Sequence, residues 1–442
     1  MQRHRHVYTV ALVICDGWLT ASAVALPPGD KVPPGDEAPE ALQEQPAAET
    51  AAEDATRPVD PSRRKRQRPG ALQREDEVAD FRTRFAPDPL EPALEGVGYP
   101  STMAWLDEKI NLELDFDLMF AWQGATDVID QQQQVATGRF DITGRWQPVD
   151  DANWGRGTLG FLLEANFVIG NNQDERLGVN IGSLLGVNGA IEPQGFRGGE
   201  FWWRQESTDR RFAFTIGRLD QSVYFDINRV ANDEMTAFFT PALVNNPAVP
   251  FPNNGGGFNI AWRLNDLVTL NAGIGDALAR PTGWNFYTLH DGDFFAALEL
   301  QFSPRFGDAL GQYRFLFWHN DTDTANGGGF SLSFDQDLGG GFVPFLRYGF
   351  GERDVTLVRQ SVSGGLGIEG PFGYPGELIG VGAIWADHST PGVPDETILE
   401  LFYRLQLTDT LQLTPMIQVL FNPALSDKQI VGVFGARLLM TF

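Results

Sequence analysis

Cysteine is almost absent from the chain, because Cys15 is the one cysteine among 442 residues. Cys15 lies in a segment that we predict is removed, so the mature protein has no disulfide and no cysteine-based zinc site. Beyond that segment no run of about 18 apolar residues occurs, which excludes a membrane-spanning helix. Positive charge is also scarce, since the net charge is -25 at pH 7. This balance excludes the basic surface that binding of nucleic acid needs.

Catalytic and metal-binding motifs are lacking as well. The histidines beyond the N-terminal segment, His290, His319 and His388, are far apart and have no metal-ligand spacing. The glycines of GLGIEG at 365–370 match a dinucleotide-binding pattern, but they lie within a strand pattern that no helix follows. No serine–histidine signature is recognisable. We therefore expect no cofactor, no metal and no enzymatic activity.

The N-terminal quarter differs from the rest of the chain. Residues 1–25 have a basic start, a short apolar core and the small-residue cleavage site Ala23-Val24-Ala25, which together predict an export signal peptide. Residues 26–100 are rich in Pro, Ala and acids, and they predict a disordered periplasmic extension. Its basic run SRRKRQR (62–68) is either a solvated cluster or a contact with an anionic partner, such as cell wall or lipid headgroups.

From residue 105 to 442 the sequence alternates strand and turn patterns. In INLELDFDLMF (110–120) apolar residues alternate with Asn111, Glu113, Asp115 and Asp117, so the two kinds lie on opposite faces of a strand. A soluble sandwich would bury the apolar row, whereas a membrane barrel would turn it to lipid and the acids to a watery lumen. About sixteen candidate strands follow one another, at 110–120, 137–147, 158–169, 199–207, 211–218, 257–263, 267–275, 294–302, 311–319, 329–335, 341–350, 360–369, 377–387, 396–405, 410–420 and 429–442.

Short and long connections alternate between these candidates. The short ones include 207–210, 264–266, 337–340 and 407–410, and the longer ones are 121–136, 170–198, 219–256, 276–292 and 320–328. A meander barrel that crosses a membrane has this pattern, and only a closed sheet satisfies every backbone group in lipid. We therefore predict an all-β, 16-stranded antiparallel transmembrane β-barrel over 105–442, in the outer membrane of a bacterium.

The connection 219–256 is the longest and is rich in apolar and aromatic residues such as Tyr224, Phe225 and Phe238. Exposed, a loop of that character would aggregate. We expect it to fold inward and narrow the pore as a constriction loop. The alternative is an external loop that packs on its neighbours or on another subunit. The small residues of 170–198 also suit a loop inside the mouth, although a gate, a subunit contact and a lid stay open.

Two stretches of the chain resemble a known family. GRLDQSVYFDINRVANDEMTAFFTPAL (217–243), followed by NNGGG, and LTPMIQVLFNPAL, followed by the last strand VGVFGARLLMTF, are similar to the carbohydrate-selective porin family (OprB type). The resemblance covers roughly 105–442. It implies a 16-stranded outer-membrane barrel, often a homotrimer, that passes glucose and other sugars by diffusion.

A pore selects solutes by its diameter and its lining groups. Paired charges replace the water around sugar hydroxyls with stronger hydrogen bonds, and aromatic rings cover the CH faces. For each strand charge, simple wetting of the lumen is the alternative to sugar contact. The candidate pore-lining and substrate residues are Glu113, Asp115, Asp117, Arg139, Asp141, Arg145, Glu164, Trp202, Arg204, Glu206, Arg218, Asp220, Asp226, Asn228, Arg229, Asn232, Asp233 and Glu234.

The leading hypothesis is an outer-membrane porin that lets small carbohydrates diffuse passively. Its partners would be sugars, outer-membrane lipid and further copies of itself, with no nucleic acid. The excess of acids predicts that ions passing the pore are mainly cations. A general porin without sugar preference is the nearest alternative. An exported soluble β-protein that binds or acts on polysaccharide is the alternative from another class, and it leaves the alternation of connections unexplained.

Overall fold

The computed structural model describes residues 84, 88, 90–129, 132–170, 176–190, 195–282 and 288–442. The predicted signal peptide (1–25) and most of the predicted extension lie outside the described residues. The end of that extension differs from the expectation, because α2 (Glu91–Gly96) and α3 (Tyr99–Ile110) are helices. The wall of the barrel accordingly begins at Leu112 and not at residue 105.

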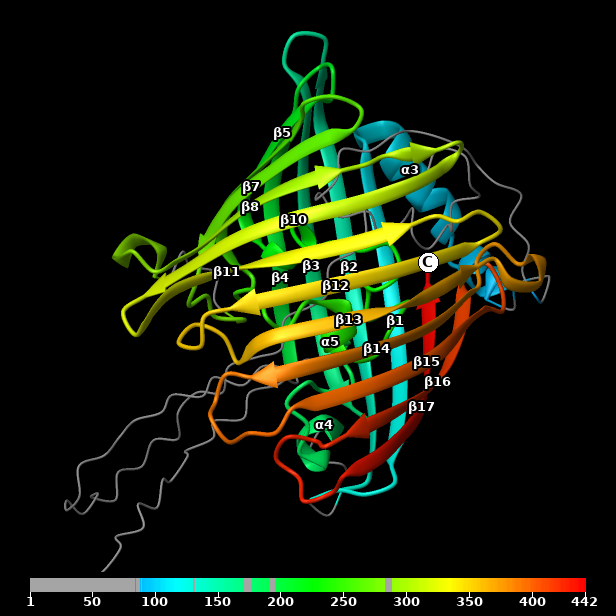
Figure 1. Ribbon diagram of the computed structural model, residues 1–442. Coiled ribbons are helices and arrows are strands. Elements are labelled where there is room, and N and C mark those ends of the chain that lie inside the picture. Colours follow the sequence, from blue (N-terminus) through cyan, green and yellow to red (C-terminus); the bar gives the residue numbers. More distant parts are fainter. Residues whose placement is uncertain are drawn as a thin grey trace, which may run out of the picture.

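The described strands form one antiparallel sheet that closes on itself (Figure 1). β1 pairs with both β2 and β17, and this seam closes the wall. At its end Phe116 and Phe442 exchange backbone hydrogen bonds of 2.8 and 3.0 Å. The strands are β1 (Leu112–Ala125), β2 (Gln134–Asp151), β3 (Gly155–Val168), β4 (Gly195–Glu206), β5 (Phe212–Leu219), β6 (Gly255–Arg263), β7 (Val268–Asp276), β8 (Phe294–Phe302), β9 (Arg305–Phe306), β10 (Ala309–Thr322), β11 (Ala325–Gln336), β12 (Phe342–Gly351), β13 (Val358–Glu369), β14 (Leu378–His388), β15 (Glu396–Gln406), β16 (Leu411–Phe421) and β17 (Ile430–Thr441).

The predicted fold class is confirmed. β9 pairs only with β10, and the other strands make a 16-stranded wall in which each predicted strand overlaps one observed strand. The remaining short elements are α4 (Leu177–Ile181), α5 (Pro241–Val244) and the 3-10 turns η1 (Gln221–Val223), η2 (Leu289–Asp291) and η3 (Pro371–Gly373). Among the described residues, no helix combines the length and the apolar character needed to cross a membrane.

The alternation of side chains sets the two faces of the wall. In β15 the odd row, Leu399 and Leu401, is exposed on the outside, while Glu400 and Arg404 on the even row are buried inside. In β1 the carboxylate of Asp117 is inside, where it accepts a hydrogen bond from Thr441 Oγ1 at 2.6 Å. Leu114, Phe116 and Leu118 therefore form the outward row. The apolar row faces outward and the acids face the lumen, which is the arrangement that a membrane barrel requires.

Two glycines on the outward row of β2 leave room for phenylalanine rings of β3. A Cβ on Gly138 would lie 2.3 Å from the ring of Phe167, and a Cβ on Gly144 would lie 2.2 Å from the ring of Phe161. Each ring belongs to the residue directly opposite in the register. The rings cover the bare backbone at these positions, which stabilises strands that glycine would otherwise weaken.

The connections alternate in length most clearly in the first half of the chain. Turns at 152–154, 207–211 and 264–267 are short, whereas 169–194, 220–254 and 277–293 are long. The longer connection expected at 320–328 is wrong, because β10 and β11 extend as one ribbon to a tight turn at 323–324. The short turns and the long loops lie at opposite ends of the barrel.

Candidate functional site: the constriction

The long connection between β5 and β6, residues 220–254, is called the constriction loop here. It folds into the barrel, and its helix α5 lies behind the wall strands in Figure 1. From Asp220 to Val249 every residue except Asp233 is buried. The predicted inward fold is therefore confirmed, and the alternative of an external loop is excluded.

Apolar packing holds the constriction loop against the later half of the wall. The ring of Phe238 meets the rings of Phe345 (β12) and Phe402 (β15), with centroids 5.7 and 4.9 Å apart. Leu243 and Phe239 belong to the same buried cluster. Full burial of one such side chain contributes about 1.5–3 kcal/mol, so this packing is a large part of what fixes the loop.

Buried arginines of the wall hold the backbone carbonyls of the constriction loop. Arg347 donates to the carbonyl oxygens of Asp226 at 2.7 Å and Val244 at 2.7 Å. Arg404 donates to the carbonyl of Thr236 at 3.2 Å, and Arg437 donates to the carbonyls of Glu234 and Ala237. The chain has no regular secondary structure over most of this stretch, so these charged donors satisfy carbonyls that would otherwise be buried without partners.

Carboxylates of the wall hold backbone N–H groups of the same loop. Glu400 accepts from Phe239 N at 2.5 Å and from Thr240 N at 2.9 Å. Glu299 accepts from Asp226 N at 2.7 Å, and Asp335 accepts from Arg229 N at 3.2 Å. These inward carboxylates hold the constriction loop in place. Because loop N–H groups occupy their oxygens, few acceptors remain for a passing solute.

Asp226 itself is a strained and buried residue of the constriction loop. Its φ is 57°, in the left-handed region, and its carboxylate accepts a hydrogen bond from Ser331 and lies 3.4 Å from Arg347 Nε. Burial raises the pKa of this carboxyl above its usual range, although Arg347 and Ser331 act in the opposite direction. Such backbone strain persists only where the surroundings hold the residue firmly.

A second segment, 176–190, also lies inside the barrel. Its Ser183 hydroxyl and Leu184 N–H donate to the carboxylate of Glu396, the latter at 2.9 Å. Gln123 and Gln418 both donate to the carbonyl of Val187, at 3.0 and 2.9 Å. Of the alternatives that the sequence left open for 170–198, packing inside the mouth is the one observed for 176–190.

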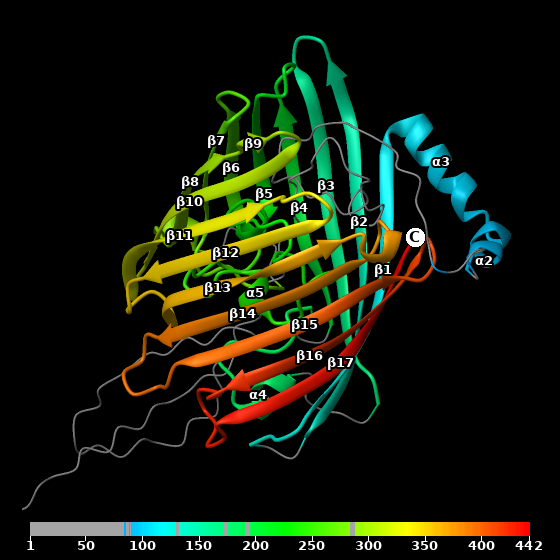
Figure 2. The ribbon, with the colours of Figure 1, turned by 45° about the vertical axis from the view of Figure 1, so that its right-hand side comes forward.

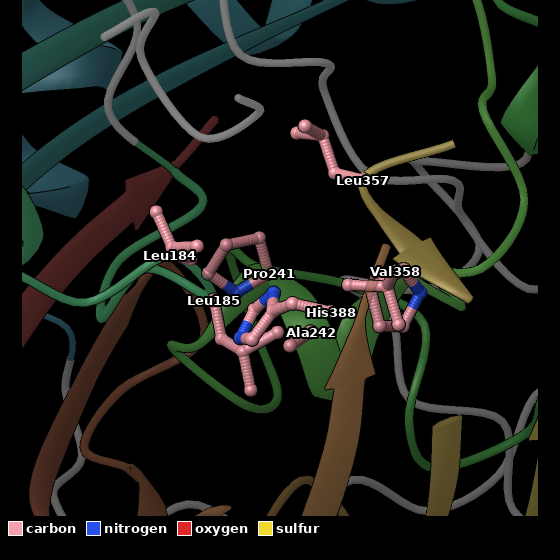
Figure 3. Close-up of a pocket in the computed structure, with 8 residues that line it drawn as sticks. Leu184, Leu185, Pro241, Ala242, Leu357, Val358 and His388 are labelled. Atoms are coloured by element: carbon pink, nitrogen blue, oxygen red, sulfur yellow. The ribbon is translucent and has the colours of Figure 1, made fainter. Parts of the chain in front are cut away.

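A small cavity remains between the two inward segments and the wall (Figure 3). Its lining is apolar except for His388, whose Nε2 lies 3.9 Å from Glu396 Oε2. A sugar site needs several convergent polar groups. This cavity therefore fits a gap in the packing and not a solute site. The apolar lining consists of Leu184, Leu185, Pro241, Ala242, Pro247, Leu357 and Val358.

Charged groups gather where the constriction loop meets β2–β4. Arg139 of β2 lies 2.8 Å from Asp141 and 2.5 Å from Glu164, and its Nη1 lies 3.4 Å from the carboxylate of Glu234 in the loop. Arg197 of β4 lies 2.8 Å from the other oxygen of Glu164. This cluster of both signs, named the charge cluster below, spans the loop and the wall.

Two further charge pairs lie on the same side of the lumen, toward the short turns. Arg145 is 2.9 Å from Glu113 and 3.7 Å from Asp115, and the side chain of Glu113 is 55% exposed. Arg204 is 2.9 Å from Glu206 near the end of β4. The structure thus aligns three groups of mixed charge along β1–β4.

Several predicted site residues instead have structural partners. Trp202 is 6% exposed, its ring covers Gly160, and its Nε1 donates to Glu200 at 3.1 Å. Arg218 donates to the carbonyls of Gly198 at 2.9 Å and Pro281 at 2.6 Å.

The polar residues of the constriction loop show the same pattern. The Asp220 side chain caps η1, and Asn228 Oδ1 accepts from two N–H groups of its own turn. Asn232 Oδ1 accepts from Arg347 at 2.9 Å, and Arg229 pairs with Glu369 at 2.7 Å. These contacts shape the loop.

Sequence reasoning missed the residues that fasten the loop. The arginines and acids of the wall lie on the inward rows of their strands, and the alternation of apolar and polar residues indicates this orientation. The same alternation does not indicate which of these residues the constriction loop covers. In the part of the chain that the structure describes, no three histidine, aspartate or glutamate side chains are grouped so that they could hold a metal ion. The missed residues that fasten the constriction loop are Glu299, Asp335, Arg347, Glu400, Arg404 and Arg437. Glu396, which holds the segment 176–190, and Arg197 of the charge cluster were missed as well.

Residues 327–442, from β11 to the C-terminus, match the family described as "Carbohydrate-selective porin, OprB family". The matched part carries Arg347, Arg404 and Arg437, which hold the constriction loop. The resemblance stated from the sequence is confirmed for this part of the chain.

Two known proteins are similar to more of the chain. The high-pH structure of Pseudomonas putida OprB covers 83% of this chain and 100% of its own, with a TM-score of 0.67 and 14% identity. That likeness shows the fold. An uncharacterized protein of Aquifex aeolicus is 26% identical over 230 residues, which cover 52% of this chain and 64% of that protein.

Proposed function

We propose that the protein is an outer-membrane porin through which small carbohydrates diffuse passively. One observation carries the proposal: Arg145, Glu113 and Asp115 form a partly exposed group of both signs on the inward face of a barrel that the constriction loop narrows. The match of residues 327–442 to a carbohydrate-selective family supports sugar as the solute.

The partly exposed group of Arg145, Glu113 and Asp115 suits a neutral, polyhydroxylated solute. Each sugar hydroxyl both donates and accepts, so it exchanges water for a carboxylate on one side and a guanidinium on the other. Because the site offers a positive and a negative group that neutralise each other, a sugar without charge can bind there. A rigid loop keeps the passage narrow enough for these contacts, and selectivity follows from diameter and lining together.

We assign the contacts with sugar first to Arg145, Glu113 and Asp115, because the side chain of Glu113 is 55% exposed and the other two are partly exposed. Arg204 with Glu206 lines the path beside them toward the short turns. The buried charge cluster of Arg139, Glu164, Arg197 and Glu234 instead fixes the constriction loop against the wall. This assignment rests on these distances and on the exposure of the side chains.

The test is single-channel conductance of the refolded protein in a planar bilayer, with glucose and then maltose added to the bath. We expect stepwise current that sugar blocks in a saturable manner. The variant Glu113→Gln should weaken the block about tenfold, because a lost charge-assisted hydrogen bond of about 1.4 kcal/mol changes affinity by that factor.

The matched control is Asp150→Asn near the β2–β3 turn, whose side chain is 65% exposed. It should leave the block unchanged. A current that sugar lowers only in line with bulk conductivity would leave a general porin without sugar preference. Folded protein that gives no steps would favour the exported soluble β-protein.

Export and assembly are parts of the same proposal. Removal of residues 1–25 would give a mature chain that starts at Leu26, and N-terminal sequencing of protein from the outer membrane tests this. A homotrimer is supported by the resemblance of 105–442 to a family that often forms trimers. Light scattering in detergent measures the mass, and a single-chain mass would contradict the trimer.

A further inference from the structure

The helix α3 packs on the outside of the barrel. The ring of Tyr99 lies 6.1 Å from the rings of Phe116 and Phe442, both at the β1–β17 seam, and Phe116 belongs to the outward row. Trp146 Nε1 donates to the carbonyl of Ile110 at 3.0 Å, which fixes the other end of the helix. Figures 1 and 2 both show α3 beside β1 and outside the wall.

The residues before α3 follow the same rim. Arg84 pairs with Glu377 at 2.5 Å and donates to Tyr403 Oη at 2.6 Å. Tyr403 lies on the outward row of β15, between the buried Phe402 and Arg404. Asp88 then accepts from Thr410 N at 3.0 Å. The described residues from 84 to 110 thus touch the short-turn rim at β15, at the β15–β16 turn and at β1.

One flank of α3 has the composition of a membrane-surface helix. Tyr99, Met103 and Leu106 are its more covered residues and turn toward the wall. Trp105 and Lys109 are four residues apart, so they share a side of the helix, and Trp105 is 54% exposed. Tryptophan and lysine both combine an apolar body with a polar tip that suits the headgroup layer.

The apolar surface continues from the barrel onto this helix. Trp146 and Ile110 are exposed next to the outward row of β1, and Val97 is exposed just before α3. Asp107, two residues from Trp105, lies on the opposite flank of α3 and is exposed. The membrane surface of the barrel and the flank of α3 therefore form one band at the short-turn end.

We propose that α3 lies in the headgroup layer of the leaflet on the short-turn side, with Trp105 and Lys109 bound to phospholipid. The helix then acts as an interfacial anchor that fixes the depth of the β1–β17 seam in the bilayer. This inference rests on the proposed membrane location of the barrel, and the experiment separates the two.

The experiment uses single-cysteine variants in a Cys15→Ser background. Trp105→Cys, Asp107→Cys and Leu399→Cys each receive a nitroxide label, and the protein is refolded into phospholipid vesicles. Accessibility to oxygen, which concentrates in lipid, and to a water-soluble nickel complex is measured by EPR. Heat-dependent gel mobility shows that each variant is folded.

The label at 399 on the outward wall reports whether the barrel is in the bilayer. We expect a several-fold higher oxygen-to-nickel ratio at 105 than at 107, and the highest ratio at 399. A ratio at 105 equal to that at 107, with 399 in lipid, overturns the anchor alone. Low access of both reagents at 105 also overturns it, because a protein surface then covers the helix. Nickel access at 399 overturns the proposed porin.

Lys109→Gln tests the contact with headgroups. In vesicles that contain anionic phosphatidylglycerol, this change should lower the oxygen-to-nickel ratio at 105, because the ammonium no longer holds the helix at the charged surface. In purely zwitterionic vesicles the change should be smaller. An equal or absent effect in the two kinds of vesicle would contradict the role given to Lys109.

Discussion

Arg347 shows how a single inward charge organises the lumen. It is fully buried, and its guanidinium reaches the carbonyls of Asp226, Leu243 and Val244, which come from two separate parts of the constriction loop. A planar group with several fixed donors is suited to such a junction, and lysine is not. On a part of the wall that is exposed to water, the same guanidinium would bind solute. Because Arg347 is buried under the constriction loop, it binds the backbone of that loop.

Arg347→Met should therefore loosen the loop without harming the wall. The change leaves Asp226 buried without its ion pair, a loss of about 3–5 kcal/mol in the stability of the native packing. We expect larger and noisier single-channel currents and a lower temperature of unfolding in detergent. Arg347→Lys should show an intermediate effect.

The control for this prediction is Arg359→Met, because Arg359 is partly exposed and its pair with Asp387 spans 3.7 Å. An exposed pair contributes at most about 1 kcal/mol. Equal behaviour of the variants at 347 and 359 would show that the loop does not depend on its buried anchors.

At the scale of elements, the strands were readable from the sequence and the inner contacts were not. A period of two repeats locally, so INLELDFDLMF and ETILELFYRL indicate strands without knowledge of any partner. The inward row includes both Arg139, which meets the loop through Glu234, and Arg145, which stays on the open side. The difference depends on the path of a loop far away in the sequence, and no local pattern encodes that path.

α3 was missed for another reason. It crosses from the predicted disordered extension, which ends at residue 100, into the predicted barrel domain, which begins at residue 105. Yet Tyr99, Met103, Leu106 and Ile110 repeat at helical spacing, and Pro100 stands at the start of the helix, where proline is favoured. A boundary drawn from average composition concealed a local period.

The strands themselves offer a test at Gly144. A Cβ there would meet the ring of Phe161 at 2.2 Å, so Gly144→Ala must displace the ring from the outer face of β2. We expect a loss of about 1–3 kcal/mol, typical of overpacking, measured by urea unfolding in detergent. Gly96→Ala is the matched control, because no atom lies within 4 Å of its added Cβ. Equal stability of the two variants would contradict the role of the phenylalanine rings.

The whole molecule carries a strong excess of acid, with a net charge of -25. Field lines concentrate in a narrow lumen with low-dielectric walls, so the excess should raise the local concentration of cations. In a gradient of potassium chloride, we expect a reversal potential whose sign shows that potassium passes more readily than chloride. The preference should shrink at high salt as screening increases. A reversal potential of the opposite sign would contradict it.

The seam between β1 and β17 has a consequence for the order of events in the cell. The groups that close the wall, Phe116 and Phe442, stand near the two ends of the folded domain. No cylinder can therefore form before β17 has paired with β1. Until then both edge strands carry unpaired backbone groups next to long apolar rows, an arrangement prone to aggregation. Loss of β17 alone would leave β1 and β16 as permanent open edges.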